Sequence, residues 1–379
     1  MSCEWKACNL GSIMTFKNGK KRPKTVGKFP VYGGNGILGY TNEWNNENCV
    51  VIGRVGAYCG SVFREYSKCW ISDNAICGIS NNDNIEYLYY LLSSLQLNHR
   101  HIGTSQPLLT QEILNNIQVT IPPYVVQNKI ALILRSLDDK IELNDKINDN
   151  LQQQVSEIYR AWYQDFMCAG DVPLVESEYG MIPEGWHYSL LGKLCKSISV
   201  THKFDAEKLI FLNTGDVEDG RFLHSNYMAI SDMPGQAKKT IAPGDILYSE
   251  IRPINKHFAY VNFPAANYVV STKLMVIRAN SFDSRRLYHF LTSRDVLSEL
   301  QMQAESRSGT FPQIRFDNVS KLPILIADDA TEATFTTLLH TVYEQIEHNN
   351  RENEKLSTLR DSLLPRLMSG EIDVSAIQI

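Results

Sequence analysis

Two stretches of the chain share one pattern of apolar and polar positions. Steps of three and four residues along 134–162 give a line of apolar side chains that two asparagines, Asn144 and Asn148, interrupt. The same steps along 339–367 give a second line, with Asn349 and Asn353 at the matching places. Such alternating steps are typical of the apolar stripe of a helix that packs along another helix. The pattern therefore predicts two long helices that pair with each other.

The two stripes match when the helices run antiparallel. Pairing the positions whose numbers sum to 497 places Asn144 opposite Asn353 and Asn148 opposite Asn349, and it places Leu137 opposite Arg360 as the one mismatch. Buried asparagine lowers the stability of such a stripe but fixes its register. Other facing pairs are Ile141 with Leu356, Leu151 with Ile346 and Trp162 with Phe335. The residues predicted to pair the helices are Leu134, Ile141, Asn144, Asn148, Leu151, Ile346, Asn349, Asn353 and Leu356.

Two further blocks begin with one motif. Trp5 and Leu10–Gly11 recur as Trp186 and Leu191–Gly192, and both blocks contain glycine-punctuated runs of β-branched residues that predict strands and turns. Residues 85–97 and 285–301 predict one helix in each block. The chain therefore reads as a tandem duplication. We expect an α+β protein in which two globular α/β domains are separated by two long helices that form an antiparallel coiled coil with pseudo-two-fold symmetry. The expected limits are 1–121 for the first globular domain, 122–165 for the first long helix, 166–185 for a linker, 186–322 for the second globular domain, and 323–379 for the second long helix and tail.

The net charge of −5 is divided unevenly among these blocks. Residues 1–121 and 183–322 each carry a net charge of +3, whereas 122–182 carry −5 and 323–379 carry −6. A charge of +3 is a weak signal for nucleic acid, but the alternation assigns any phosphate contacts to the globular domains rather than to the helices.

Hydrophobicity and cysteine usage indicate a cytoplasmic protein. No apolar run of about 18 residues predicts a membrane span, and the first residues lack the pattern of a signal peptide. The eight cysteines include neither a Cys-x-x-Cys pair nor a neighbouring histidine cluster. We therefore expect reduced thiols and no metal site.

Enzyme motifs occur only as incomplete matches. The run from Ile121 to Tyr124 is similar to the Asn/Asp-Pro-Pro-Tyr motif of amino-methyltransferases, but Ile121 offers no acceptor for an adenine amino group. Asp245 and Glu250 are closely spaced and Arg252 stands where a nuclease has lysine, so turn and strand-surface positions explain these acids better. No Walker loop or strand–Gly-x-Gly–helix unit is present. We expect no catalytic residues, no metal and no cofactor in this chain.

Basic and amide side chains in the globular domains are the candidates for DNA contact. A basic cluster precedes the glycine-rich turn in the first domain, where it can neutralise phosphates while the turn presents polar groups to base edges; a solvated loop explains the cluster equally well. Arg285, Arg286 and Arg294 are instead expected to be solvated on a helix face. The candidates are Lys20, Lys21, Arg22, Lys24, Tyr32, Asn35, Arg54 and Gln106 in the first domain, and Lys238, Lys239, Arg252, Lys256, Arg307, Gln313 and Arg315 in the second.

With these features in place, the chain resembles the DNA-specificity subunit of type I restriction–modification enzymes. The resemblance rests on the tandem halves and on residues 121–152, 182–194 and 349–372. It implies that each globular domain is a target-recognition domain for one half of a bipartite DNA sequence. It also implies that the helices set the spacing and dock two methyltransferase subunits, and that restriction/translocase subunits join this core. S-adenosylmethionine, ATP and Mg would then belong to the partner subunits.

One signature of that family is present in only one of the two halves. Its Pro-Pro-x-x-x-Gln pattern appears as Pro122, Pro123 and Gln127, but no matching glutamine follows Pro323. The resemblance therefore leaves open whether both sides of a complex make equal contacts.

The distance between the recognition domains follows from the helix length. The stripe from 134 to 162 is roughly 42 Å long at 1.5 Å per residue, and one turn of B-DNA is about 34–36 Å. We expect a gap of roughly 5–8 base pairs between the half-sites. Two other functions stay open. The first is a DNA-modifying enzyme, which would bind S-adenosylmethionine. The second is an interaction scaffold; a DNA affinity of the assembled complex that falls steeply with added salt would argue against it.

Overall fold

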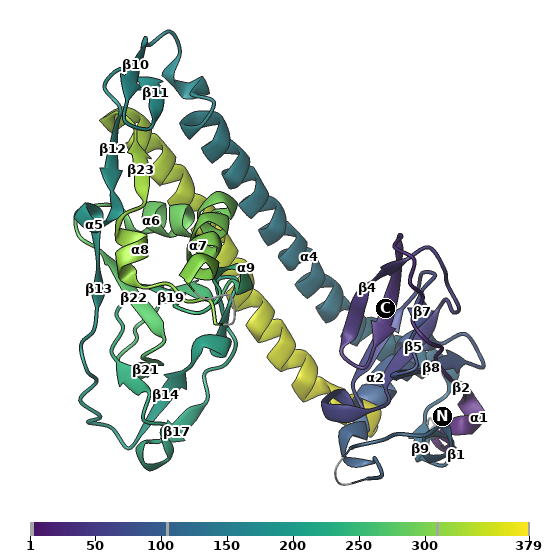
Figure 1. The fold of residues 1–379 in the computed structure, drawn as a ribbon. Helices are drawn as coiled ribbons and strands as arrows, with labels where there is room; N and C mark the ends of the chain where they lie inside the picture. Colours follow the sequence, from purple (N-terminus) through teal and green to yellow (C-terminus); the bar gives the residue numbers. More distant parts are fainter. Residues whose placement is uncertain (1–3, 104–105, 308–310, 378–379) are drawn as a thin grey trace. The chain divides into compact units, whose positions relative to one another are not determined.

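The computed structural model describes residues 4–103, 106–307 and 311–377 (Figure 1). The chain divides into two compact units, Met1–Ile147 with His348–Ile379 and Asn148–Glu347. Each unit contains one globular part and a portion of each long helix. The domain limits expected from the sequence follow the ends of the helices instead, and they stay a prediction.

The first unit is built on an antiparallel sheet with the strand order β2-β8-β5-β6. Its central strand β5 (Cys49–Gly53) is fully buried and its core contacts helix α2 (Ile85–Ser94). The side chain of Asn84 caps α2 by accepting from the Tyr87 N–H. The other elements of the unit are β1 (Lys6–Asn9), α1 (Leu10–Ile13), β2 (Met14–Asn18), β3 (Phe29–Gly33), β4 (Gly36–Thr41), the 3-10 helices η1 (Gly56–Tyr58) and η2 (Leu97–His99), β6 (Val62–Glu65), β7 (Trp70–Ile71), β8 (Ala75–Ser80), α3 (Gln111–Asn115) and β9 (Gln118–Ile121).

The second unit repeats this plan. Its antiparallel sheet β13-β22-β19-β20 corresponds to β2-β8-β5-β6, and its pair β12–β23 corresponds to the pair β1–β9. Its second sheet has four strands, β17-β14-β21-β18, where the first unit has the three strands β4-β3-β7. The elements are η3 (Met167–Ala169), β10 (Leu174–Ser177), β11 (Gly180–Pro183), β12 (His187–Leu190), α5 (Leu191–Leu194), β13 (Cys195–Ile198), β14 (Lys208–Leu212), η4 (Thr214–Asp216), β15 (Val217–Glu218), β16 (Arg221–Phe222), β17 (Tyr227–Ala229), η5 (Ile230–Asp232), β18 (Ala237–Lys239), β19 (Ile246–Ser249), η6 (Pro253–Asn255), β20 (Phe258–Tyr260), β21 (Tyr268–Ser271), β22 (Leu274–Ala279), α6 (Ser284–Leu291), α7 (Arg294–Arg307), α8 (Phe316–Ser320) and β23 (Pro323–Ile326).

The predicted helix over 285–301 is in fact two helices, α6 and α7. The break follows Leu291, where the hydroxyls of Thr292 and Ser293 donate to the carbonyls of Tyr288 and Phe290. Such side-chain bonds compete with the helical backbone pattern and favour helix ends. In the first unit, α2 likewise ends before Gln96, whose φ of 48° is left-handed.

The two remaining helices, α4 (Tyr124–Tyr163) and α9 (Asp329–Met368), have forty residues each. Helix α4 begins directly after Pro122 and Pro123, since proline cannot donate a backbone hydrogen bond. At the start of α9, the Asp328 carboxylate accepts from the N–H groups of Ala330 and Thr331. A search of the described part of the chain finds no helix with the length and hydrophobicity that a membrane crossing requires.

Candidate nucleic-acid interface and helix pair

The two long helices contact each other through the predicted asparagines in the first unit. Asn144 Nδ2 donates to Asn353 Oδ1 at 2.8 Å and to Glu352 Oε2 at 2.7 Å. Asn353 Nδ2 in turn donates to Asp145 Oδ1 at 3.1 Å. The pairing of position 144 with position 353 is therefore confirmed. It is a hydrogen bond between two side-chain amides.

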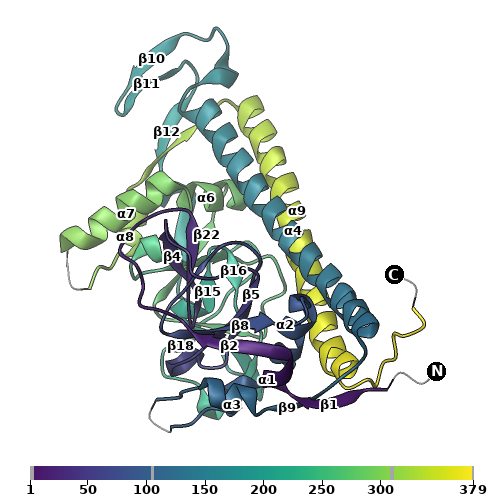
Figure 2. The same ribbon diagram turned by 90° about the vertical axis from the view of Figure 1, so that its right-hand side faces the viewer.

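Aromatic residues form the corresponding contact in the second unit. The rings of Trp162 and Phe335 lie 5.8 Å apart, and the ring of Tyr163 lies 5.2 Å from that of Phe335, which is fully buried. The predicted pairing of position 162 with position 335 is thus confirmed as well. Within the first unit Asp138 contacts Arg360 and Asn144 contacts Asn353, so the numbers fall along α9 as they rise along α4 and the two helices run antiparallel there (Figure 2).

The remaining stripe positions are buried to different degrees. Leu134 is fully buried in the core of the first unit, and Ile346 is 6% exposed in the second. Asn148 and Asn349 are also buried, and Ile141, Leu151 and Leu356 are half-buried. The guanidinium of Arg360, the one mismatch, donates to Asp138 Oδ1 at 2.8 Å.

The basic cluster of the first unit lies against its small sheet. Lys20, Lys21, Arg22 and Lys24 are exposed in the connection from β2 to β3. The Lys20 N–H donates to the carbonyl of Ile71 in β7. The Arg22 guanidinium lies so close to Gly39 of β4 that a Cβ atom at position 39 would be 2.6 Å from Arg22 Nη2. Asn35 is exposed in the tight turn between β3 and β4. The structure thus brings the four cations to the sheet whose hairpin carries Asn35.

Three other candidates of the first unit are placed differently. Tyr32 is only 7% exposed and its hydroxyl donates to Glu65 at 3.0 Å; burial and this acid raise the pKa of Tyr32. Arg54 is half-buried and donates to the carbonyl of Asp73 at 3.4 Å. Gln106 is exposed directly after residues 104–105, which lie outside the described residues.

In the second unit, two lysines already have protein partners. Lys239 Nζ donates to the carbonyls of Thr272 and Leu274 at 2.9 and 2.8 Å, and burial lowers the pKa of Lys239. Lys256 Nζ contacts Asp219 at 3.0 Å. Lys238, the neighbour of Lys239 on β18, is exposed.

A β-bridge brings three other candidates together. Ile251 pairs with Gln313, and the Arg252 N–H donates to the carbonyl of Pro312 at 3.2 Å. Arg252 and Arg315 are exposed, while Gln313 is half-buried and accepts from Lys273 at 3.5 Å. Arg307 ends α7, but its side chain and the loop residues 308–310 lie outside the described residues.

Two predictions about charged residues are wrong. Arg285 and Arg286 are not solvated: they are 7% and 0% exposed, because α9 supplies the acids Glu347 and Glu332 to them. Arg294 is exposed, as expected.

Asp245 lies at a turn, which is one of the two positions predicted for it, but its side chain is not at the surface. It is fully buried, and its carboxylate accepts from Arg278 at 2.6 and 2.8 Å and from the Ala242 N–H at 2.8 Å. It therefore holds a turn and an arginine in place. Over the residues that the structure describes, no three His, Cys, Asp or Glu side chains gather as a metal site would require.

A family model described as the type I restriction modification DNA specificity domain matches residues 3–153 and again residues 183–358. The HindI specificity subunit of Haemophilus influenzae is 42% identical over 181 residues, which cover 47% of this chain and 39% of that protein. The MjaIX specificity subunit of Methanocaldococcus jannaschii is 25% identical over 308 residues, covering 77% of this chain and 70% of that protein. The chain thus spans well under half of the first of these relatives.

A solved structure has a similar fold over nearly all of both chains. It is the type I restriction-modification S subunit from M. genitalium, which is 16% identical, covers 97% of this chain and 96% of its own, and gives a TM-score of 0.59. Each family match covers one globular part and most of the long helix that follows it in the sequence. This chain belongs to the family of type I restriction modification DNA specificity domains.

Proposed function

We propose that this chain is the DNA-specificity subunit of a type I restriction–modification complex. Each globular domain reads one half of a bipartite DNA target, and the helix pair sets the gap and docks two methyltransferase subunits. The observation that carries this proposal is the pair of unlike globular domains, which share one topology and are attached to one antiparallel helix pair. A duplicated domain on a helical spacer suits a target made of two separated halves.

The two half-sites differ in sequence under this proposal. The second sheet has three strands in the first unit and four in the second, and the exposed candidates differ. Arg22, Lys24 and Asn35 serve the first domain, whereas Lys238, Arg252 and Arg315 serve the second. Cations among these neutralise phosphates, and amides and guanidinium groups reach base edges in the major groove. Tyr32 and Lys239 instead support the domains that carry the contacts.

Catalysis belongs to the partners in this proposal. The sequence lacks an adenine-binding acid before Pro122 and lacks a nucleotide loop. Methyl transfer with S-adenosylmethionine and ATP- and Mg-dependent cleavage are therefore assigned to methyltransferase and restriction/translocase subunits. The seven free cysteines among the described residues suit a cytoplasmic complex, where thiols stay reduced.

Sequencing of methylated bases in cells that carry this chain with its methyltransferase tests the proposal. We expect one motif with two unlike halves and a fixed gap of roughly 5–8 base pairs, from helix length against duplex pitch. Cells with the methyltransferase alone provide the control and should lack the motif. A single uninterrupted motif would contradict the two-domain model.

A further inference from the structure

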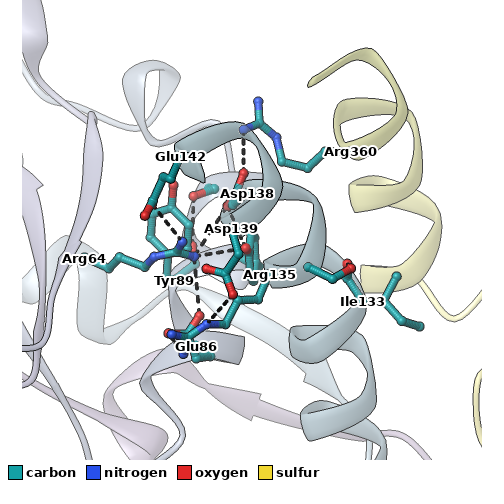
Figure 3. A network of polar contacts seen from close by, with 12 residues as sticks. Arg64, Glu86, Tyr89, Ile133, Arg135, Asp138, Asp139, Glu142 and Arg360 are labelled. Carbon is teal, nitrogen blue, oxygen red and sulfur yellow. Dashed lines mark hydrogen bonds and ion pairs between the residues drawn. The ribbon is translucent and has the colours of Figure 1, made fainter. Parts of the chain in front are cut away.

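A polar cluster with a buried centre joins the first globular part to both long helices (Figure 3). Its centre is Asp138 of α4, which is 7% exposed. Asp138 Oδ2 accepts from the Tyr90 hydroxyl of α2 at 2.6 Å and from Arg64 Nη1 of β6 at 3.4 Å. Asp138 Oδ1 accepts from Arg360 Nη1 of α9 at 2.8 Å. One carboxylate therefore contacts three separate elements, all within the first unit.

Further charges surround Asp138. Glu86 of α2 contacts Arg64 at 3.3 Å and Arg135 of α4 at 3.1 Å, and Arg64 also contacts Glu142 at 3.6 Å. Burial by itself lowers the pKa of Arg64, but the bond to Tyr90 and the charges of Glu86 and Asp138 outweigh it and raise that pKa. We call this set the Asp138 cluster; it consists of Arg64, Glu86, Tyr90, Arg135, Asp138, Glu142 and Arg360.

Buried ions behave differently from surface ion pairs. The side chains of Arg64, Asp138 and Glu86 are 11%, 10% and 17% exposed. Removal of one partner leaves an uncompensated charge away from water, which is strongly unfavourable, whereas exposed pairs contribute little. The orientation of the first globular part on the helices is therefore held by contacts that do not tolerate small displacements.

The second unit has a counterpart at the same helical positions. Glu347 of α9 lies 205 residues after Glu142, and it too contacts a guanidinium, that of Arg285. Tyr343 lies 205 residues after Asp138, and its hydroxyl is 3.2 Å from His289 Nδ1 of α6. The arginine comes from a strand in one unit and from a helix in the other. Different residues thus make a polar attachment at the same place in both repeats.

We infer that Asp138, Arg360 and Arg64 are positioning residues that restrict the complex to one gap length. This inference rests on the proposed function. One added base pair moves a half-site by about 3.4 Å and rotates it by about 35°. Only a domain held firmly in one orientation can distinguish neighbouring gaps, because a domain that tilts on its helices can follow part of that movement.

The test uses the complex of the full chain with its methyltransferase. Methylation rates are compared on duplexes that keep both half-sites but have the cognate gap, one base pair fewer or one more. For Arg360→Met and Asp138→Asn we expect the rate on the wrong gaps, relative to the cognate gap, to rise roughly tenfold, since the ionic contact between the half-buried Arg360 and the buried Asp138 carboxylate is lost. The bases read in each half should stay the same.

Two variants of the same helix act as controls. Arg366→Met removes an exposed ion pair with Glu371, whose side chains are 52% and 59% exposed, and should leave gap selectivity unchanged. Arg360→Lys keeps a cation near Asp138 and should retain most of the selectivity. If the Asp138→Asn variant does not assemble, the result for Arg360→Met tests the inference, because in that variant Asp138 keeps Tyr90 and Arg64 as partners.

The outcomes separate the inference from the proposed function. Assembled Arg360→Met complexes with the wild-type gap preference would overturn the inference and leave the proposed function standing. Altered bases at an unchanged gap would also overturn it, since the cluster would then act on base recognition. A wild-type complex that methylates regardless of gap would overturn the proposed function, and the inference with it.

Discussion

Buried ionisable side chains hold the second globular part to the helices through single residues. Arg286 is fully buried, lies 4.3 Å over the ring of Tyr163 and contacts Glu332 at 3.4 Å. His289, one turn further along α6, is 6% exposed, and burial together with the Arg286 charge lowers its pKa to about 3. The imidazole is therefore neutral in the folded protein at neutral pH.

His289 gives the stability of the second unit a dependence on pH. Its pKa is depressed from 6.5 in the unfolded chain to about 3, so its contribution is complete above pH 6.5 and is lost as the pH falls towards 3. We expect the free energy of unfolding to fall by about 2–3 kcal/mol between pH 7 and pH 4.5 through this group alone. Urea unfolding of wild type and His289→Asn at pH 7 and pH 4.5 measures this loss of free energy of unfolding.

The variant should show a smaller loss on acidification than wild type. His187→Asn, on the exposed strand β12 of the same unit, is the matched control and should behave as wild type. Equal losses for wild type and His289→Asn would show that the imidazole does not titrate in this way.

The buried arginines mark the limit of prediction at the residue scale. A sequence pattern places Arg285 and Arg286 on a helix, but it does not show that Glu347 and Glu332 come from a distant helix to pair with them. The burial of Tyr32 and Asp245 could not be predicted for the same reason, since their partners Glu65 and Arg278 are also remote in sequence. By contrast, Arg360 was visible as an exception because its neighbours in the stripe are apolar.

The long helices are the elements that the sequence predicted best. A stripe with two polar interruptions allows few registers, and pairing asparagine with asparagine selects one of them. The bonds from Asn144 to Asn353 and Glu352 confirm that register. The strands of the globular parts were less predictable, because short β-branched runs do not reveal which strand pairs with which. The order β2-β8-β5-β6 joins segments far apart in sequence.

Replacing one asparagine should destabilise the helix pair, whereas replacing both should not. Asn144→Ala leaves Asn353 Oδ1 without its donor from α4 and should lower the free energy of unfolding by about 1–3 kcal/mol. Asn144→Leu with Asn353→Leu removes both polar groups of this pair from the two stripes and should be neutral or stabilising. Urea unfolding compares the variants, with Gln154→Ala on the exposed face of α4 as control. A double variant less stable than Asn144→Ala would contradict this account.

At the scale of the whole molecule, duplication is the property on which the proposed recognition of DNA depends. Both the repeat of 181 residues between the globular blocks and that of 205 residues between the helices were visible in the sequence. The difference between the second sheets, three strands against four, was not. Unlike domains on matching helices are what a target with two unlike halves requires.

Removing facing heptads should shorten the gap between half-sites. Deleting 143–149 from α4 and 348–354 from α9 takes out segments that face each other and keeps Asp138, Arg360, Tyr343 and Glu347. Seven residues span about 10.5 Å of helix, which equals about three base pairs. Sequencing of methylated DNA should therefore report a gap about three base pairs shorter.

Deletion from only one helix is the control. It places asparagines opposite apolar residues and should prevent stable folding. An unchanged gap after the double deletion would mean that the helices do not determine the spacing.

The two polar attachments also limit how recognition domains can be exchanged between positions. Glu86 on α2 matches Arg285 on α6 when the Leu-Tyr-Tyr and Leu-Tyr-His runs that follow are aligned. Arg285 contacts Glu347, whose counterpart on α4 is Glu142, so the second domain in the first position would keep an acid for Arg285 but would lose Glu86, the acid of α2 that contacts Arg135. We therefore expect a chimaera with the second globular domain in the first position to need the matching helix face as well, and exchange between the two positions to disturb assembly more than exchange within one position.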